Sequence, residues 1–93
     1  MRQRRKKEPD PVDVHVAMRM RERRIELGLS QPKVAAELGI TFQQLYKYER
    51  AKNRIGAARL YELSKVLSVP ITFFFEGVEA ALEAQTPRPS KGG

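Results

Sequence analysis

The sequence lacks several features that whole classes of protein need. It has no cysteine and one histidine among 93 residues, which excludes disulfide bonds, thiolate metal sites and histidine-rich metal sites. It has no run of about 18 apolar residues to span a bilayer and no apolar core of a secretory signal near its N-terminus. We therefore expect a cytoplasmic protein with no metal and no other cofactor, stabilised by packing alone.

Groups suited to catalysis are also scarce. The chain has no glycine-rich loop to cradle a phosphate, and its carboxylates are scattered rather than paired. Cysteine and a metal cluster are already excluded. We therefore do not expect an enzyme.

Positive charge is what the chain has in excess. Its formal net charge is +7 at pH 7 and its pI is about 10.1. Such a surface attracts polyanions, with nucleic acid the first candidate and anionic membrane the second. No amphipathic apolar face accompanies the basic residues, so we expect no membrane association.

The chain divides into three parts. Residues 1–11 are expected to form a flexible basic arm, because they lack apolar groups to bury and contain two prolines. Residues 12–78 are predicted to form one helical domain, and residues 79–93 a C-terminal helix extension followed by a disordered tail. The basic residues of the arm are Arg2, Arg4, Arg5, Lys6 and Lys7.

Apolar residues recur at helical spacing and predict an all-α fold without strands. Ser30 and Thr41 are good N-caps, whereas Gly28 and Gly39 suit helix ends, and Gly77 is placed to break the last helix early. The predicted helices are residues 13–27, 30–39, 41–50, 57–67 and 71–85.

The second and third predicted helices are short and only a few residues apart, which is typical of a helix-turn-helix. In that motif the second helix of the pair lies in the major groove of DNA. Gly39 allows the tight turn and Ile40 anchors it to the core. Ala35 is expected where the two helices cross, because a small side chain lets them approach closely.

Several motifs keep a fixed order and spacing: Gly28-Leu29-Ser30-Gln31, Val34-Ala35, Leu38-Gly39-Ile40-Thr41, Tyr48-Glu49-Arg50, Arg59-Leu60 and Val69-Pro70. Over about residues 14–77 they resemble the XRE family, also called the Cro/repressor family. Residues 40–50 further resemble a subgroup frequent in alpha-proteobacterial regulators. The resemblance implies a five-helix lambda-repressor-like domain that binds a near-palindromic operator as a homodimer.

Three positions depart from the family pattern. Ala51 stands where glycine is common, so we expect the left-handed backbone position to move to Asn53. Pro32-Lys33 replaces a frequent acidic residue and adds positive charge. Arg23 stands where an apolar residue is usual, and its stem is expected to cover the core while its guanidinium reaches outward.

Polar residues on the third predicted helix are the candidates for reading bases. Gln43, Gln44 and Lys47 lie away from its apolar residues, and glutamine pairs with adenine while lysine reaches guanine. Phe42, at the start of this helix, either contacts a thymine methyl group or folds back onto the domain.

A second set of residues is expected to contact phosphates without reading sequence. Gln31 lies at a helix N-terminus, where an anion is favoured. The basic arm is expected to follow the backbone or enter the minor groove. Affinity should therefore fall as salt is added. The remaining backbone candidates are Lys33, Arg50, Lys52, Asn53 and Arg54.

The resemblance also implies an ion pair between Arg24 and Glu49, which would fix the angle of the third helix; the alternative is two unrelated surface charges. The run Phe73 to Phe75 cannot face one core entirely, so an exposed ring should be covered by a second subunit. The expected dimer interface comprises Phe73, Phe74, Val78 and Leu82.

The main expectation is a sequence-specific regulator of transcription, a repressor associated with the nucleoid, that binds double-stranded DNA. A second class is an antitoxin-type protein that binds DNA and also a partner protein, through residues 76–85. A third is sequence-indifferent binding of RNA or chromosome, for which basic charge alone would suffice. A one-to-one complex with another protein would favour the second class.

Overall fold

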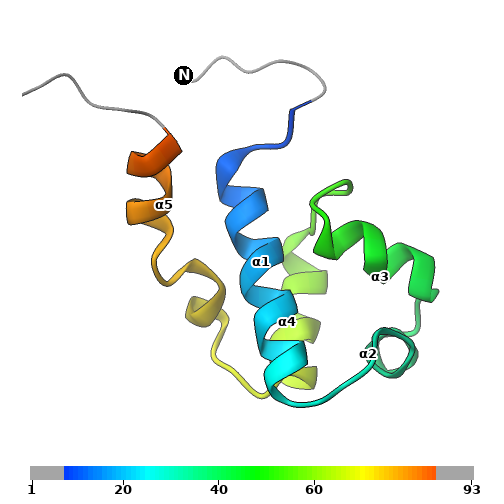
Figure 1. The fold of residues 1–93 in the computed structure, drawn as a ribbon. Coiled ribbons are helices and arrows are strands. Elements are labelled where there is room, and N and C mark those ends of the chain that lie inside the picture. The colour runs from blue at the N-terminus through cyan, green and yellow to red at the C-terminus, as the bar shows by residue number, and fades with distance from the viewer. Residues whose placement is uncertain (1–7, 86–93) are drawn as a thin grey trace, which may run out of the picture.

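The computed structural model describes residues 8–85, and within that range the chain is helical without strands, as the sequence predicted (Figure 1). None of the helices in this range is long and apolar enough to cross a membrane. The elements are α1 (Pro11–Glu26), α2 (Gln31–Leu38), α3 (Phe42–Glu49), α4 (Ala57–Val66), a 3-10 helix η1 (Ile71–Phe75) and α5 (Val78–Gln85).

Local signals set the ends of the short helices. The Ser30 hydroxyl accepts a hydrogen bond from the Lys33 amide at 3.1 Å, and the Thr41 hydroxyl accepts one from the Gln44 amide at 3.1 Å. Gly39 ends α2 in the left-handed conformation with φ of 72°, which a residue without Cβ adopts at little cost. These caps confirm the turn predicted between α2 and α3.

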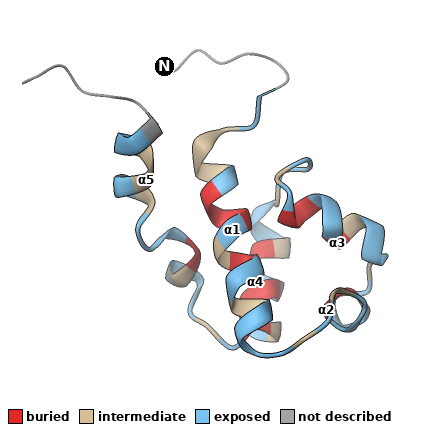
Figure 2. Cartoon of the chain, in the orientation of Figure 1, coloured by how far each residue is buried: buried red, intermediate tan, exposed pale blue. Residues whose placement is uncertain are grey.

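Helix α1 is the centre of the molecule (Figure 1). It contacts α3 along one side and η1 and α5 along the other, and α2 also packs on α3 and α4. Buried residues lie on the parts of these helices that face one another (Figure 2). The core comprises Val16, Met20, Val34, Ala35, Leu45, Tyr48, Leu60, Leu63, Leu67 and Phe74.

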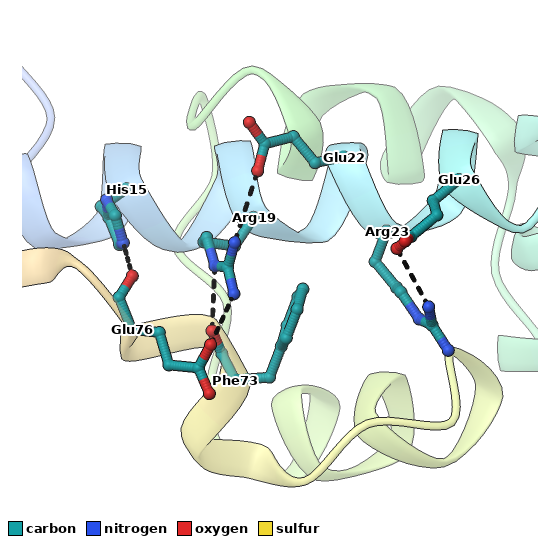
Figure 3. Close-up of polar contacts among 7 residues, drawn as sticks. All are labelled: His15, Arg19, Glu22, Arg23, Glu26, Phe73 and Glu76. Carbon is teal, nitrogen blue, oxygen red and sulfur yellow. Dashed lines mark hydrogen bonds and ion pairs between the residues drawn. The ribbon is translucent and has the colours of Figure 1, made fainter.

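Polar side chains of α1 hold the segment that follows α4 (Figure 3). His15 Nε2 donates to the Glu76 carbonyl at 2.6 Å, Arg19 Nε to the Phe73 carbonyl at 3.0 Å, and Arg23 Nε to the Leu67 carbonyl at 2.9 Å. We call these three side chains, His15, Arg19 and Arg23, the α1 seam. Arg23 thus does more than cover the core, because it also satisfies a carbonyl at the C-terminal end of α4.

The single helix predicted over residues 71–85 is interrupted. Gly77 has φ of +82°, and a Cβ at this position would lie 3.6 Å from the His15 ring. The chain therefore forms η1, turns at Gly77 and starts again as α5. Phe74 of η1 is fully buried in the core of its own chain, so its assignment to a dimer interface was wrong. The three rings differ in burial, because Phe74 is buried, Phe73 packs partly buried against the core and Phe75 is exposed.

The left-handed residue after α3 is Ala51, with φ of 58°, and its expected move to Asn53 was wrong. The Ala51 amide donates to the Tyr48 carbonyl at 3.1 Å and the Lys52 amide donates to the Lys47 carbonyl at 2.9 Å. These hydrogen bonds satisfy the last carbonyls of α3. They require the chain to change direction directly after the helix, at Ala51. Alanine therefore holds a conformation that costs it about 1 to 2 kcal/mol.

Candidate nucleic-acid interface

Helix α3 lies at an edge of the molecule with one side fixed and the other exposed (Figures 1 and 2). Leu45, Tyr48 and Glu49 are buried. The solvent side therefore offers polar, basic and aromatic groups on one rigid element. Its exposed residues are Phe42, Gln43, Tyr46 and Lys47, and Arg50 follows at the C-cap.

A buried ion pair fixes this helix to α1. Arg24 donates to both carboxylate oxygens of Glu49, at 2.6 Å from Nε and 3.1 Å from Nη2. The side chain of Glu49 is 1% exposed and that of Arg24 is 13% exposed. The pair implied by the family resemblance is therefore present, in the bidentate geometry that restricts both partners.

Two further contacts extend this pair to α2 and the preceding turn. The Gln31 amide donates to Glu49 Oε1 at 3.0 Å, and Arg24 Nη1 donates to the Leu29 carbonyl at 2.8 Å. One N–H of Gln31, which the sequence suggested for a phosphate, is thus engaged within the protein. Helices α1, α2 and α3 share one hydrogen-bonded group, which sets how α3 projects.

The predicted base-reading residues differ in their surroundings. Gln43 and Lys47 are exposed one turn apart, whereas Gln44 is half-buried with its amide nitrogen 3.5 Å from the Tyr48 hydroxyl. Phe42 is 46% exposed, so it does not fold back onto the core. The structure therefore brings Gln43, Lys47 and Phe42 to the outer side, with Gln44 at its margin.

Sequence reasoning missed Tyr46, whose ring is 40% exposed on the same side. The guanidinium carbon of Arg50 lies 4.9 Å from the centre of that ring. The available signal was the spacing of Phe42, Tyr46 and Arg50, which repeats every four residues and places all three on one stripe of a helix.

Among the described residues predicted for phosphate contact, Gln31 is half-buried and the others are exposed near the start of α2 and after α3. Lys33 pairs with Glu37 at 3.4 Å and Arg54 with Asp13 at 3.2 Å, and exposed pairs of this kind contribute little. They can therefore be exchanged for phosphate. Lys52 and Asn53 lie in the loop after α3. The arm residues Arg2, Arg4, Arg5, Lys6 and Lys7 lie outside the described range.

Arg59 of α4 contacts both α2 and α3. A hydrogen bond with Tyr48 is the largest cause that raises the pKa of Arg59 above its ordinary value. Burial lowers this pKa, and Glu62 raises it further. The Arg59 guanidinium also lies 2.7 Å from Glu62 Oε1 and 3.4 Å from the Leu38 carbonyl at the end of α2. A fixed positive charge therefore joins α4 to the turn.

Comparison with curated proteins finds relatives named as regulators. An uncharacterized HTH-type transcriptional regulator of Sinorhizobium medicae is 56% identical over 71 residues, which are 76% of this chain and 51% of that protein. An uncharacterized transcriptional regulator in the ATPase CF(0) region of Rhodospirillum rubrum is 52% identical over 68 residues, 73% of this chain and 63% of that protein. The chain thus spans about half the length of the first of these relatives.

Solved structures share the fold. The restriction-modification controller protein C.AhdI of Aeromonas hydrophila superposes with a TM-score of 0.64 at 26% identity, covering 67% of this chain and 94% of that one. The clp gene regulator ClgR of Corynebacterium glutamicum gives a TM-score of 0.72 at 15% identity, covering 84% and 82%. The latter likeness concerns the fold alone.

A family model described as helix-turn-helix, HTH_3, matches residues 20–74. This match agrees with the family resemblance found in the sequence and with the all-α fold. On the residues matched and on the identity to these relatives, the chain belongs to the HTH_3 family of helix-turn-helix proteins.

Proposed function

We propose that this chain recognises specific double-stranded DNA sequences as part of a transcriptional regulator, with α3 in the major groove. The observation that carries the proposal is the contrast between the two sides of α3. Glu49 is held by Arg24 and Gln31, while Gln43 and Lys47 are exposed. A helix fixed in angle with free amide and ammonium groups is suited to base edges.

The exposed cations beside α3 support phosphate contact. Lys33 precedes it and Arg50, Lys52 and Arg54 follow it, and all are exposed. Phosphates on each side of the groove would fix the register of α3 without adding sequence information. Binding should weaken steeply with added salt, because each neutralised phosphate releases counterions.

Selection from a random duplex library at near-physiological salt tests this proposal. The wild type should enrich one motif, and Gln43→Ala and Lys47→Ala should change or lose it. Lys65→Ala is the matched control, because it removes the same charge from an exposed position on α4. Tight, salt-sensitive binding without an enriched motif would contradict sequence-specific regulation.

We further propose that the chain acts as a homodimer on a near-palindromic operator, as a repressor that blocks polymerase. Among the described side chains of α5 none is buried, and Val78 and Leu82 are half-buried. A second copy would cover this helix. Phe73 contributes less, because it is half-buried with the Arg19 guanidinium carbon 3.8 Å from its ring centre.

Solution mass tests the dimer. Sedimentation of the wild type should give twice the chain mass, and Leu82→Glu should give the monomer while leaving helix content unchanged. The selected motif should contain two half-sites about one helical turn apart. A monomeric wild type that forms a one-to-one complex with another protein would instead favour the antitoxin-type alternative, with residues 76–85 as the contact.

A further inference from the structure

The outer side of α3 carries two parallel rows of side chains. One row is polar and comprises Gln43 and Lys47. The other comprises Phe42 and Tyr46 and continues into Arg50 at the C-cap. Residues four apart lie one above the other on a helix, so each row runs along the helix. The polar row is accounted for by the proposed function, and the aromatic row is not.

The fold makes little use of the two aromatic rings. Phe42 is 46% exposed and Tyr46 is 40% exposed. Neither belongs to the core or to the partly buried side chains packed against it. Large apolar groups gathered at an exposed site are typical of a binding surface. The rings are therefore free to contact whatever α3 approaches.

In the major groove the apolar group on a base edge is the 5-methyl group of thymine. Resting on the proposed function, we propose that Tyr46, together with Phe42, recognises thymine methyl groups and is a specificity-determining residue of α3. Phe42 lies in the first turn and Tyr46 in the second, so the two rings meet different base pairs. The sequence suggested a thymine contact for Phe42 alone, and this proposal extends it to Tyr46.

The neighbouring groups fit this assignment. The Arg50 guanidinium carbon lies 4.9 Å from the centre of the Tyr46 ring, which restrains the ring and places a cation beside it for a phosphate. An A·T base pair offers adenine to Gln43 and a methyl group to a ring. Gln43 and the aromatic row therefore both favour A·T pairs in the part of the half-site that faces them, whereas Lys47 favours guanine.

The test replaces each thymine of the selected duplex with deoxyuridine, one at a time, and measures the Kd. Removing the methyl group takes away the apolar contact and leaves base pairing intact. Wild type should lose about fourfold in affinity at a contacted thymine, the loss expected for one methylene-sized group. Tyr46→Ala should bring the uracil-to-thymine ratio of Kd values to about one at one such position.

Two variants separate recognition from a structural role. Tyr46→Phe keeps the ring and should keep the wild-type ratio at every position. Tyr61→Ala is the matched control, because Tyr61 on α4 is also exposed and has Lys65 5.1 Å from its ring centre. It should leave all ratios unchanged. Phe42→Ala should also bring the uracil-to-thymine ratio of Kd values to about one, but at a different thymine from the one that Tyr46→Ala affects.

The outcomes are distinguishable. An enriched motif for which wild type binds uracil and thymine duplexes equally would overturn this inference and leave the proposed function intact. The same holds if Tyr46→Ala weakens binding overall but preserves every ratio, since Tyr46 would then act on the backbone or on the helix. A library without any enriched motif would overturn both.

Discussion

The two sides of α1 are held by different chemistry. On one side, α3 is fixed by a carboxylate that is 1% exposed and by the core residues Leu45 and Tyr48. On the other, η1 and Glu76 after it are held by His15 and Arg19 of the α1 seam (Figure 3), and one ring of η1, Phe74, is buried. The side proposed to read DNA is therefore fixed in angle, whereas the described side chains of η1 and α5, proposed to dimerise, include only one that is buried, so this side should open more readily.

The largest expected effect is the loss of the single ring that anchors the second side. Phe74→Ala should reduce the free energy of unfolding by about 3 to 5 kcal/mol, because it leaves a cavity in the core. Chemical denaturation measures this loss. Phe75→Ala is the control, since that ring is 41% exposed and should cost much less. Equal losses for the two variants would contradict the division of the three phenylalanines.

Removing one partner of the buried ion pair should break the first side. Glu49→Gln leaves the Arg24 charge without its carboxylate and should cost about 3 kcal/mol of unfolding free energy. Glu62→Gln is the control, because its pair with Arg59 is exposed, at 51% for the Glu62 side chain, and should cost less than about 1 kcal/mol. A Glu49 variant as stable as the control would show that the pair contributes little to fixing α3.

The seam offers a smaller and more local effect. Arg19→Ala removes hydrogen bonds to the Phe73 carbonyl and, at 2.9 Å, to the Glu76 carboxylate, and should cost roughly 1 to 2 kcal/mol. Hydrogen exchange of amides in α5 should speed up more than exchange in α3. Arg21→Ala, an exposed change on the same helix, serves as the control. Uniform acceleration in both helices would remove the distinction between the two sides.

The smallest expected effect is a gain in stability. Ala51→Gly should stabilise the fold by about 0.5 to 1 kcal/mol, because glycine adopts the left-handed conformation without strain. The gain is smaller than the strain itself, because glycine also increases the conformational entropy of the unfolded chain. Thermal unfolding measures this difference. Ala36→Gly, at an exposed position inside α2, should shift stability in the opposite direction. A destabilised Ala51→Gly variant would contradict the strain assigned to Ala51.

Local signals explain what could be predicted from the sequence. Ser30, Gly39 and Thr41 set helix ends through contacts within a few residues, so the α2–α3 turn followed from sequence alone. The Arg24–Glu49 pair joins residues 25 positions apart, and only the family resemblance suggested it. The helical spacing of Phe42, Tyr46 and Arg50 also predicts that Tyr46 lies on the outer side of α3, but the interpretation of the sequence considered only the polar residues and Phe42.

Other features depend on long-range packing. Three identical rings in a row carry no sign of which one turns inward, because that depends on the 3-10 geometry of η1 and the break at Gly77. His15 and Arg19 contact residues 61 and 54 positions away, and no local pattern reports such contacts. Ala51 kept its backbone conformation because the hydrogen bonds that close α3 fix where the chain must reverse.

Each donor of the α1 seam contacts a main-chain carbonyl. Substitutions should therefore be tolerated differently on α1 and on the segment that faces it. Every amino acid presents a carbonyl, so a substitution at Ser68 leaves the acceptor of Arg23 in place. A substitution at Glu76 keeps the carbonyl that His15 contacts but loses the carboxylate that Arg19 contacts. The donors on α1 have no such replacement. A mutational scan should therefore find α1 intolerant at Arg19 and Arg23 and the facing position Ser68 permissive, which would let the exposed surface there change while its attachment to α1 is kept.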